Sequence, residues 1–319
     1  MHTIQNQNQY CPRTDLANEC VEMHFGNSAP DNDGIKVYSE TRGGITFEIL
    51  EILNREGSEK LGKPIGKYVT ANIGKITLYT RERFVSVVSV CADVLSELIP
   101  KNGSCLFACL GNRQIASDAQ GPLCADHLIV SKHILSNAPE LFSNLSLAET
   151  MCIVPDVLGN TGIEAADIVR GVADKVKPSF VIAVDSLASR KTSRIGSTLQ
   201  FSNAGIAPGS GVGNHRTALS FETLGIPVIS LGVPTVVDAV TVGADILEET
   251  FGRTDTKIIT EKTKENILES VLKNGSYGYF VAPKDADKIS SCAARLIGTV
   301  INKALNPGLE ISEMEDITG

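Results

Sequence analysis

The chain has 319 residues, of which 42% are apolar and 21% are charged, and its formal net charge at pH 7 is −8. This size and composition allow one large buried core with a smaller lobe attached. The negative charge argues against direct binding to nucleic-acid phosphates. No apolar run approaches the roughly twenty residues of a membrane span, and the first ten residues lack a secretion signal. We therefore expect a cytoplasmic protein without nucleic-acid or membrane partners.

Eight cysteines are scattered along the chain and form no Cys-x-x-Cys pair. This spacing predicts reduced thiols rather than disulfides or a zinc cluster. Cys124 follows the loop that carries Asp118, but packing of a small side chain on a helix is the ordinary explanation for a cysteine there. We expect no metal and no other cofactor.

The first hundred residues favour an extended arm followed by strands and a helix. Residues 1–34 are polar and rich in turn formers, which is typical of an arm. Three strand-like runs follow, at 35–40, 45–53 and 68–78. From Arg81 to Leu98 apolar residues recur at helical spacing, and Pro100 stops the pattern.

After residue 103 short strands alternate with helices. The expected strands are 104–110, 151–154, 180–184, 195–201 and 227–231. The expected helices are 123–135, 161–176 and 236–249, followed by a helical stretch at 262–305 with a break at 275–278. This alternation predicts an α/β fold: a mostly parallel sheet with helices on both faces, a small N-terminal β-rich lobe and a helical C-terminal tail. The last dozen residues are expected to fray.

Two aspartates are predicted beyond the carboxyl ends of strands, where function gathers in open parallel sheets. Asp118 lies in the loop 110–122, and Asp185 directly follows the strand 180–184. Asp118 can equally be a helix N-cap. Asp185 follows four apolar residues and needs a partner or a proton, because burying an isolated charge is costly. If the two carboxyl groups converge, they can act as an acid and a base that activate water against a peptide carbonyl.

A Gly-rich loop at 208–216 is the third candidate feature, and it contains Gly209, Gly211, Gly213 and His215. A dinucleotide-binding loop directly follows the first strand and opens a helix, whereas this loop comes late in the chain. Its backbone amides can instead contact a substrate or an oxyanion, and a plain structural turn explains the pattern equally well. We take these four residues as candidates for substrate binding, although a solvent-facing loop histidine is the commoner situation.

Several motifs occur in the order in which they are found in the germination proteases of spore-forming bacteria. They are Cys-Pro-Arg-Thr-Asp-Leu-Ala at 11–17, Asp-Ala-Gln-Gly-Pro at 118–122, Pro-Asp-Val-Leu-Gly-Asn-Thr-Gly-Ile-Glu at 155–164, Asp-Ser-Leu-Ala at 185–188, Pro-Gly-Ser-Gly-Val-Gly-Asn at 208–214, Glu-Thr-Leu-Gly-Ile-Pro-Val at 222–228 and Gly-Val-Pro-Thr-Val-Val-Asp-Ala at 232–239. The chain resembles this family over roughly residues 11–250. The stretch after residue 253 is shorter than in the family and lacks its long polar insertion.

The resemblance implies an endopeptidase of an unusual aspartic type that begins the degradation of small acid-soluble spore proteins during germination. It implies catalytic roles for Asp118 and Asp185, a homotetramer, a location in the developing spore and the spore core, and a fold distantly similar to hydrogenase maturation proteases. The family's substrates are cut after an acidic residue and before an apolar residue and Ala, with Glu further on. The segment Asp-Leu-Ala-Asn-Glu at 15–19 fits this description.

The resemblance further implies an inactive precursor that processes itself. We expect cleavage between Asp15 and Leu16, favoured by acid, so that residues 1–15 are a propeptide. Residues 16–100 are then the N-terminal part of the catalytic domain, 101–305 the α/β core with its helical tail, and 306–319 a frayed end.

Two alternatives remain open. One is a metal-dependent maturation-type peptidase in which Asp118, Asp185 and His215 hold a divalent ion, since carboxylates and imidazole are suitable ligands. The other is a non-enzymatic nucleotide-binding module that uses the Gly-rich loop.

Overall fold

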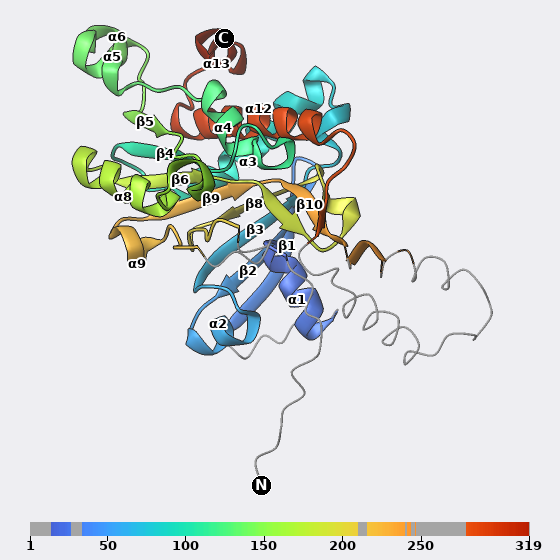
Figure 1. Ribbon diagram of the computed structural model, residues 1–319. Coiled ribbons are helices and arrows are strands. Elements are labelled where there is room, and N and C mark those ends of the chain that lie inside the picture. Colours follow the sequence, from blue (N-terminus) through green and yellow to red (C-terminus); the bar gives the residue numbers. More distant parts are fainter. Residues whose placement is uncertain are drawn as a thin grey trace, which may run out of the picture.

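A mixed eight-stranded sheet forms the centre of the protein (Figure 1). The computed structural model describes residues 14–26, 34–209, 216–239, 241–243, 246 and 279–318. In spatial order the strands of this sheet are β1 (Ile35–Arg42), β2 (Ile45–Ile52), β3 (Gly66–Asn72), β8 (Thr198–Ser202), β9 (Val228–Gly232), β6 (Phe180–Val184), β4 (Cys105–Cys109) and β5 (Thr150–Ile153). A second sheet contains β11 (Phe280–Val281), β10 (Pro234–Asp238) and β7 (Leu187–Ser189).

The described α-helices pack mainly around the large sheet. They are α1 (Ala17–Phe25), α2 (Arg55–Leu61), α3 (Arg81–Leu98), α4 (Gln120–Cys124), α5 (Lys132–Asn137), α6 (Pro139–Asn144), α7 (Leu158–Thr161), α8 (Ala165–Val176), α9 (Phe221–Leu224), α12 (Ala286–Leu305) and α13 (Ile311–Thr318). Short 3₁₀ turns lie at η1 (Ile76–Leu78), η2 (Ala116–Asp118), η3 (Ala125–His127) and η4 (Thr192–Arg194).

The predicted α/β class with a parallel core is confirmed. Strands β9, β6, β4 and β5 run parallel, and their mostly apolar sequences are typical of strands buried on both faces. Strands β1, β2, β3 and β8 are antiparallel to their neighbours. The N-terminal strands extend the main sheet instead of forming a lobe of their own, because β3 pairs with β8 over five residue positions.

The main apolar core lies between one face of the sheet and helices α3 and α12 (Figure 1). Phe107, Ile182 and Leu231 point into it from neighbouring strands and are at most 1% exposed. On the opposite face there are two separate apolar clusters. Helix α8 covers β4, β6 and β9, whereas α1 and α2 cover β1 to β3. Between these two clusters the sheet face is polar.

Three predicted elements were wrong, two of them because residues far away in the sequence form hydrogen bonds with the element. The expected helix 123–135 is interrupted after η3, because the Asn302 side chain accepts a hydrogen bond from Ile129 N and donates one to His127 O. The expected helix from 236 is the strand β10 as far as Asp238, since its β-branched residues pair with β7 and β11. The expected third strand ends at Asn72, and residues 76–78 form η1.

The expectation that residues 306–319 fray was also wrong. Residues 311–318 form α13, in which Ile311 and Met314 are buried. Glu315 on the same helix forms ion pairs with Arg81 and Arg295 from α3 and α12. The apolar contacts and these charges together hold the helix against the body of the protein.

The seven cysteines within the described residues are all free, as the sequence predicted. Cys124 is fully buried at the end of α4. Among the helices of the described chain, we find none that is long and apolar enough to cross a membrane.

Candidate active site

Asp118 is held by the loop that leaves the carboxyl end of β4. Asn112 N donates to the backbone oxygen and to Oδ2 of Asp118, both at 3.0 Å. The loop turns back on itself at Gly111, which has a φ of +113° and could not carry a Cβ, since this atom would lie 2.1 Å from Asp118 O. Asp118 does not cap α4, because Ala119 occupies that position. The N-cap interpretation of Asp118 was therefore wrong.

Hydrogen bonds from two other elements fix this loop. Thr235 Oγ1 on β10 donates to Ser117 O at 2.6 Å, and Ser290 Oγ on α12 donates to Ala116 O at 2.6 Å. Both hydroxyl groups belong to buried residues. The carboxyl group of Asp118 is thus positioned by a rigid surrounding, as a catalytic group requires.

Asp185 follows β6 directly and is 5% exposed. Its Oδ1 accepts a hydrogen bond from Ser186 N at 2.9 Å. Its carbonyl oxygen accepts one from Nε2 of the fully buried Gln120 at 2.6 Å. Gln120 Oε1 and Ser186 Oγ are buried without a hydrogen-bond partner among the described residues. Two buried polar atoms of Gln120 and Ser186 therefore have hydrogen-bonding capacity that no described residue uses.

Gly121 brings the two aspartate loops together. It lies in α4, and a Cβ at this position would be 2.1 Å from Leu110 O and 2.6 Å from Val184 O. The helix therefore touches the backbone at the ends of both β4 and β6. Asp118 lies three residues before Gly121 in the sequence, and Asp185 is the first residue after β6. The sequence prediction placed both residues at strand ends, and the structure brings them to one edge of the sheet.

Electrostatics separate the roles of the two carboxyl groups. Burial raises the pKa of Asp118 from 3.8 to about 6; the nearby Asp156 adds to the increase, whereas the Asn112 hydrogen bond and Arg216 oppose it. Burial, followed by the charges of Asp118 and Asp15, raises the pKa of Asp185 well above its usual range. At neutral pH Asp118 is then mostly ionised, whereas Asp185 keeps its proton to a higher pH than a free aspartate does. Two neighbouring carboxyl groups in different surroundings are what an acid–base mechanism would use.

A groove of about 980 Å³ runs over the polar face of the sheet beside this pair. Its floor includes Gln200 on β8 and Gly232 on β9, which are register partners. The next strand, β6, pairs Val184 with Leu231, so that Asp185 stands beside Gly232. A Cβ on Gly232 would lie 2.4 Å from Asp185 O. Asp185, Gly232 and Gln200 therefore form one row across three strands.

The chain's own segment 14–19 is bound at the groove, which Thr14 and Asp15 line, and continues into α1. Asp15 N donates to Ala188 O at 2.9 Å, and Ala188 N donates to Asp15 Oδ2 at 2.8 Å. Leu16 is completely buried. The carboxylate of Glu19, also fully buried, accepts hydrogen bonds from the Arg190 and Lys191 amides at 2.6 and 3.0 Å.

Further contacts hold both ends of this segment. Thr14 Oγ1 donates to Glu19 Oε2, and Arg194 Nε lies 3.4 Å from Glu19 Oε1. The five residues Asp15 to Glu19 thus contact the body of the protein on both sides of the Asp15–Leu16 bond. Thr14 and Asp15 also line the groove.

Part of the Gly-rich loop lies outside the described residues, namely Gly211, Gly213 and His215. Gly209, at the edge of the described part, has a φ of +70°. The segment leading to it, including Gly205, Ile206 and Ala207, lines the groove. No group of three or more His, Cys, Asp or Glu residues that could hold a metal occurs within the described ranges.

Sequence reasoning missed Gln120, Gln200 and Lys63, which contact Asp185 or the bound segment. One signal existed for Gln200, because a Gln between Leu199 and Phe201 in a buried strand is unusual and needs hydrogen-bond partners. For Lys63 the sequence holds no comparable signal.

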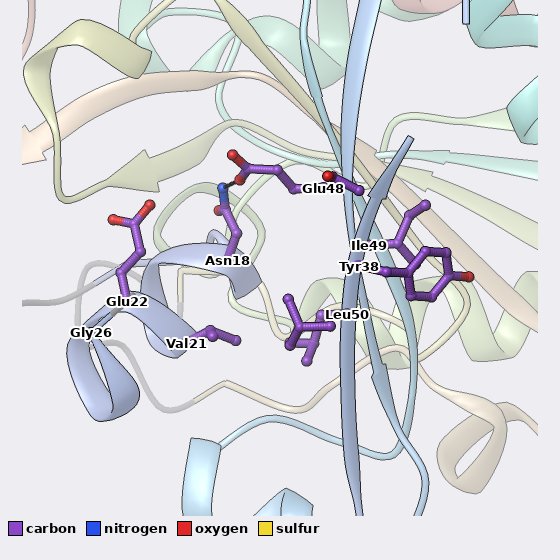
Figure 2. A pocket seen from close by; sticks show the side chains of 10 residues that line it. Asn18, Val21, Glu22, Gly26, Tyr38, Glu48, Ile49 and Leu50 are labelled. Carbon is purple, nitrogen blue, oxygen red and sulfur yellow. Dashed lines mark hydrogen bonds between the residues drawn. The ribbon is translucent and has the colours of Figure 1, made fainter. Parts of the chain in front are cut away.

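A second hollow, of about 280 Å³, lies between α1 and strands β1 and β2 (Figure 2). Asn18 and Glu48 face one another across it and are hydrogen-bonded. It contains none of the predicted site residues. Of the residues singled out from the sequence, Asp15 lines the larger groove, and Asp185 adjoins it beside Gly232.

Several known proteins are similar to this chain in sequence. The sequence profile of the germination protease family, Peptidase_A25, matches residues 14–257. A germination protease of Caldanaerobacter subterraneus is 38% identical, and the match covers 96% of this chain and 97% of that protein. A germination protease from Clostridium acetobutylicum is 36% identical, and the match covers 95% of this chain and 97% of that protein. One from Priestia megaterium is 40% identical, and the match covers 77% of this chain and 69% of that protein.

Among solved structures, a [NiFe] hydrogenase maturation protease, HycI from Thermococcus kodakarensis, is similar with 17% sequence identity and a TM-score of 0.34. The match covers 65% of this chain and 98% of that one. The profile match and the nearly full-length relatives decide the assignment: the chain belongs to the germination protease family.

Proposed function

We propose that the chain is an endopeptidase of an unusual aspartic type, made as a self-processing zymogen, that cuts small acid-soluble spore proteins after an acidic residue and before an apolar one. The observation that carries this proposal is the position of segment 14–19: Thr14 and Asp15 line the groove, and the charges of both Asp15 and Asp118 act on Asp185. The Asp-Leu-Ala-Asn-Glu sequence of this segment matches the substrate pattern of the family. A homotetramer in the developing spore and spore core is part of the same proposal.

The chemistry is hydrolysis of one peptide bond. Ionised Asp118 takes a proton from a water molecule, whose oxygen attacks the carbonyl carbon. Neutral Asp185 donates its proton to the leaving nitrogen, and the bond between carbon and nitrogen breaks. One water is consumed, and a carboxyl group and an amine are formed. At the end of the reaction Asp118 carries a proton and Asp185 is ionised. Proton exchange with solvent then returns both carboxyl groups to their starting states.

We further propose that Gly209, Gly211, Gly213 and His215 contact the backbone of the substrate. Two facts support this. The chain enters this loop from the wall of the groove, and Gly209 already has a backbone conformation that favours glycine.

Purified precursor is expected to convert to a form that begins at Leu16, and this form is expected to cut a small acid-soluble spore protein after acidic residues. The reason is that the Asp15–Leu16 bond is already seated in the groove. Intact mass, together with mass mapping of the spore-protein fragments, measures both reactions. Because the segment belongs to the same chain, the rate constant of self-processing should not depend on protein concentration. Cleavage at unrelated bonds, or a precursor that digests the spore protein at full rate, would contradict the zymogen proposal.

The rate of self-processing is expected to fall about tenfold per pH unit below pH 6, because the pKa of Asp118 is raised to about 6 and only its ionised form accepts a proton. Acidification from alkaline pH increases the rate until Asp185 is neutral, and further acidification then decreases it. Asp156, Arg216 and Asp15 also act on this pair. Asp156→Asn should move the acid limb to lower pH, because Asp156 raises the pKa of Asp118. A rate that keeps increasing below pH 5 would contradict the assignment of Asp118 as the base.

A further inference from the structure

The carbonyl group of the Asp15–Leu16 peptide bond accepts two hydrogen bonds. They are separate from the contacts that hold the side chains of Asp15 and Glu19. The carbonyl oxygen of Asp15 accepts from Lys63 Nζ at 3.0 Å and from Gln200 Nε2 at 3.0 Å. This oxygen belongs to the peptide bond that self-processing breaks. Two donors, one of them charged, thus meet on the atom that gains negative charge when water attacks.

The Gln200 amide spans the bond. Its Nε2 donates to Asp15 O, and its Oε1 accepts from Ala17 N at 2.7 Å. One side chain therefore holds the residue before the bond and the second residue after it. The contact to Ala17 also fixes the orientation of the amide, since only the oxygen can accept from that N–H.

Lys63 is supplied by the loop between α2 and β3. Ser58 Oγ donates to Lys63 O at 2.7 Å, and Tyr68 OH donates to Pro64 O at 2.8 Å, so the loop is tied to the elements on either side of it. Lys63 Nζ also donates to Thr14 O at 3.4 Å. An ammonium group held at this point places a positive charge beside the carbonyl oxygen in a half-buried groove, where charge interactions are stronger than in water.

We propose that Lys63 and Gln200 stabilise the oxyanion during cleavage of the Asp15–Leu16 bond, an inference that rests on the peptidase function proposed above. Water attacks the Asp15 carbonyl carbon, and the electron pair of the double bond moves to the oxygen that Lys63 and Gln200 contact. When the bond between the Asp15 carbon and Leu16 N breaks, the electron pair on the oxygen re-forms the carbonyl double bond, and the oxygen loses its negative charge. Preorganised donors of this kind act mainly on the transition state.

The row across the sheet supports this assignment. Gln200 and Asp185 are separated by Gly232, which has no side chain, and they face the same side of the sheet. The donors come from β8 and the α2–β3 loop, whereas the aspartates lie at the ends of β4 and β6. The oxyanion donors and the groups that act on the water therefore come from different elements.

The test measures self-processing in the full chain by intact mass, with thermal unfolding as a check of the fold. Lys63→Met and Gln200→Glu are each expected to reduce the rate constant by about a hundredfold to a thousandfold, the usual effect of losing one oxyanion donor. Lys63→Arg keeps a charged donor and should stay within about tenfold of the original chain. Lys67→Met is the matched control, because Lys67 on β3 forms its ion pair with Glu51 on β2; the rate of this variant should be unchanged.

The Gln200→Glu variant distinguishes stabilisation of the oxyanion from binding of segment 14–19 alone. Its carboxylate still accepts from Ala17 N but can no longer donate to Asp15 O. Hydrogen exchange at the Ala17 amide therefore reports whether the segment stays in the groove. A slow reaction with Ala17 still protected supports the inference. Lost protection in both Gln200→Glu and Lys63→Met would overturn it, because the residues would then only seat the segment.

Rates within twofold of the original chain in both folded variants would overturn the inference but leave the proposed function intact, since the original chain still processes. An original chain that neither processes itself nor cuts a spore protein would overturn the proposed function, and the inference with it.

Discussion

Asp118→Asn and Asp185→Asn are each expected to reduce cleavage of a spore protein, and self-processing, by at least about a thousandfold. Asn can neither accept the proton of the attacking water nor donate one to the leaving nitrogen as a carboxyl group does. The measurement is the rate of substrate loss and of conversion to the form that begins at Leu16. Asp126→Asn is the matched control, because Asp126 pairs with Arg113 at the surface and lies outside the groove.

These variants should lose activity without losing stability. The folded-state pKa of Asp118 is raised, so the stability that this group contributes is present below its usual pKa of 3.8 and is lost as the pH increases through about 6. At pH 7 the Asn variant is thus expected to be as stable as the original chain or more stable, by up to roughly 3 kcal/mol. Normal turnover by either folded Asn variant would remove that residue from the mechanism.

Gly121→Ala is expected to destabilise the protein by about 3 kcal/mol or more, and to reduce cleavage as well. The new Cβ would meet Leu110 O at 2.1 Å and Val184 O at 2.6 Å. These are backbone atoms of the strands that position the two aspartates, so they cannot move aside without disturbing the site. The midpoint of urea unfolding measures the loss.

Gly171→Ala is the matched control for this prediction. Gly171 lies within α8, where a Cβ would meet nothing within 4 Å. Ala at an open helical position stabilises by about 0.5–1 kcal/mol. An unfolding midpoint of Gly121→Ala equal to that of the original chain would show that α4 does not need this close contact.

The parts of the site that could be predicted from the sequence are those set by local patterns. The run 180–184 is apolar throughout and ends in Asp185, and the helix Arg81–Leu98 follows its apolar spacing to the residue. Such patterns indicate where a parallel strand ends and therefore where side chains gather. The position of both aspartates follows from this reasoning.

The remaining parts depend on partners that are distant in the sequence. Gln200 reaches the groove because β8 pairs with β3 and β9, which no local pattern indicates. The helix expected at 123–135 is broken by Asn302, which lies 173 residues beyond Ile129. Residues 236–238 were expected to begin a helix, but they belong to strand β10, whose hydrogen bonds β7 and β11 supply. In each case partners far away in the sequence decide the structure.

The segment 14–19 sits in the groove while joined to the rest of the chain through α1, and this tether has a consequence for inhibition. A tethered ligand acts at an effective concentration on the order of millimolar, so a free substrate must compete with it at that level. Cutting the Asp15–Leu16 bond frees the residues up to Asp15 from the tether, whereas Glu19 remains attached to it. Under the proposed function, the mature form would therefore still carry one half of its own competitor, and a spore protein would gain the Arg190 and Lys191 amides only when its own glutamate displaces Glu19.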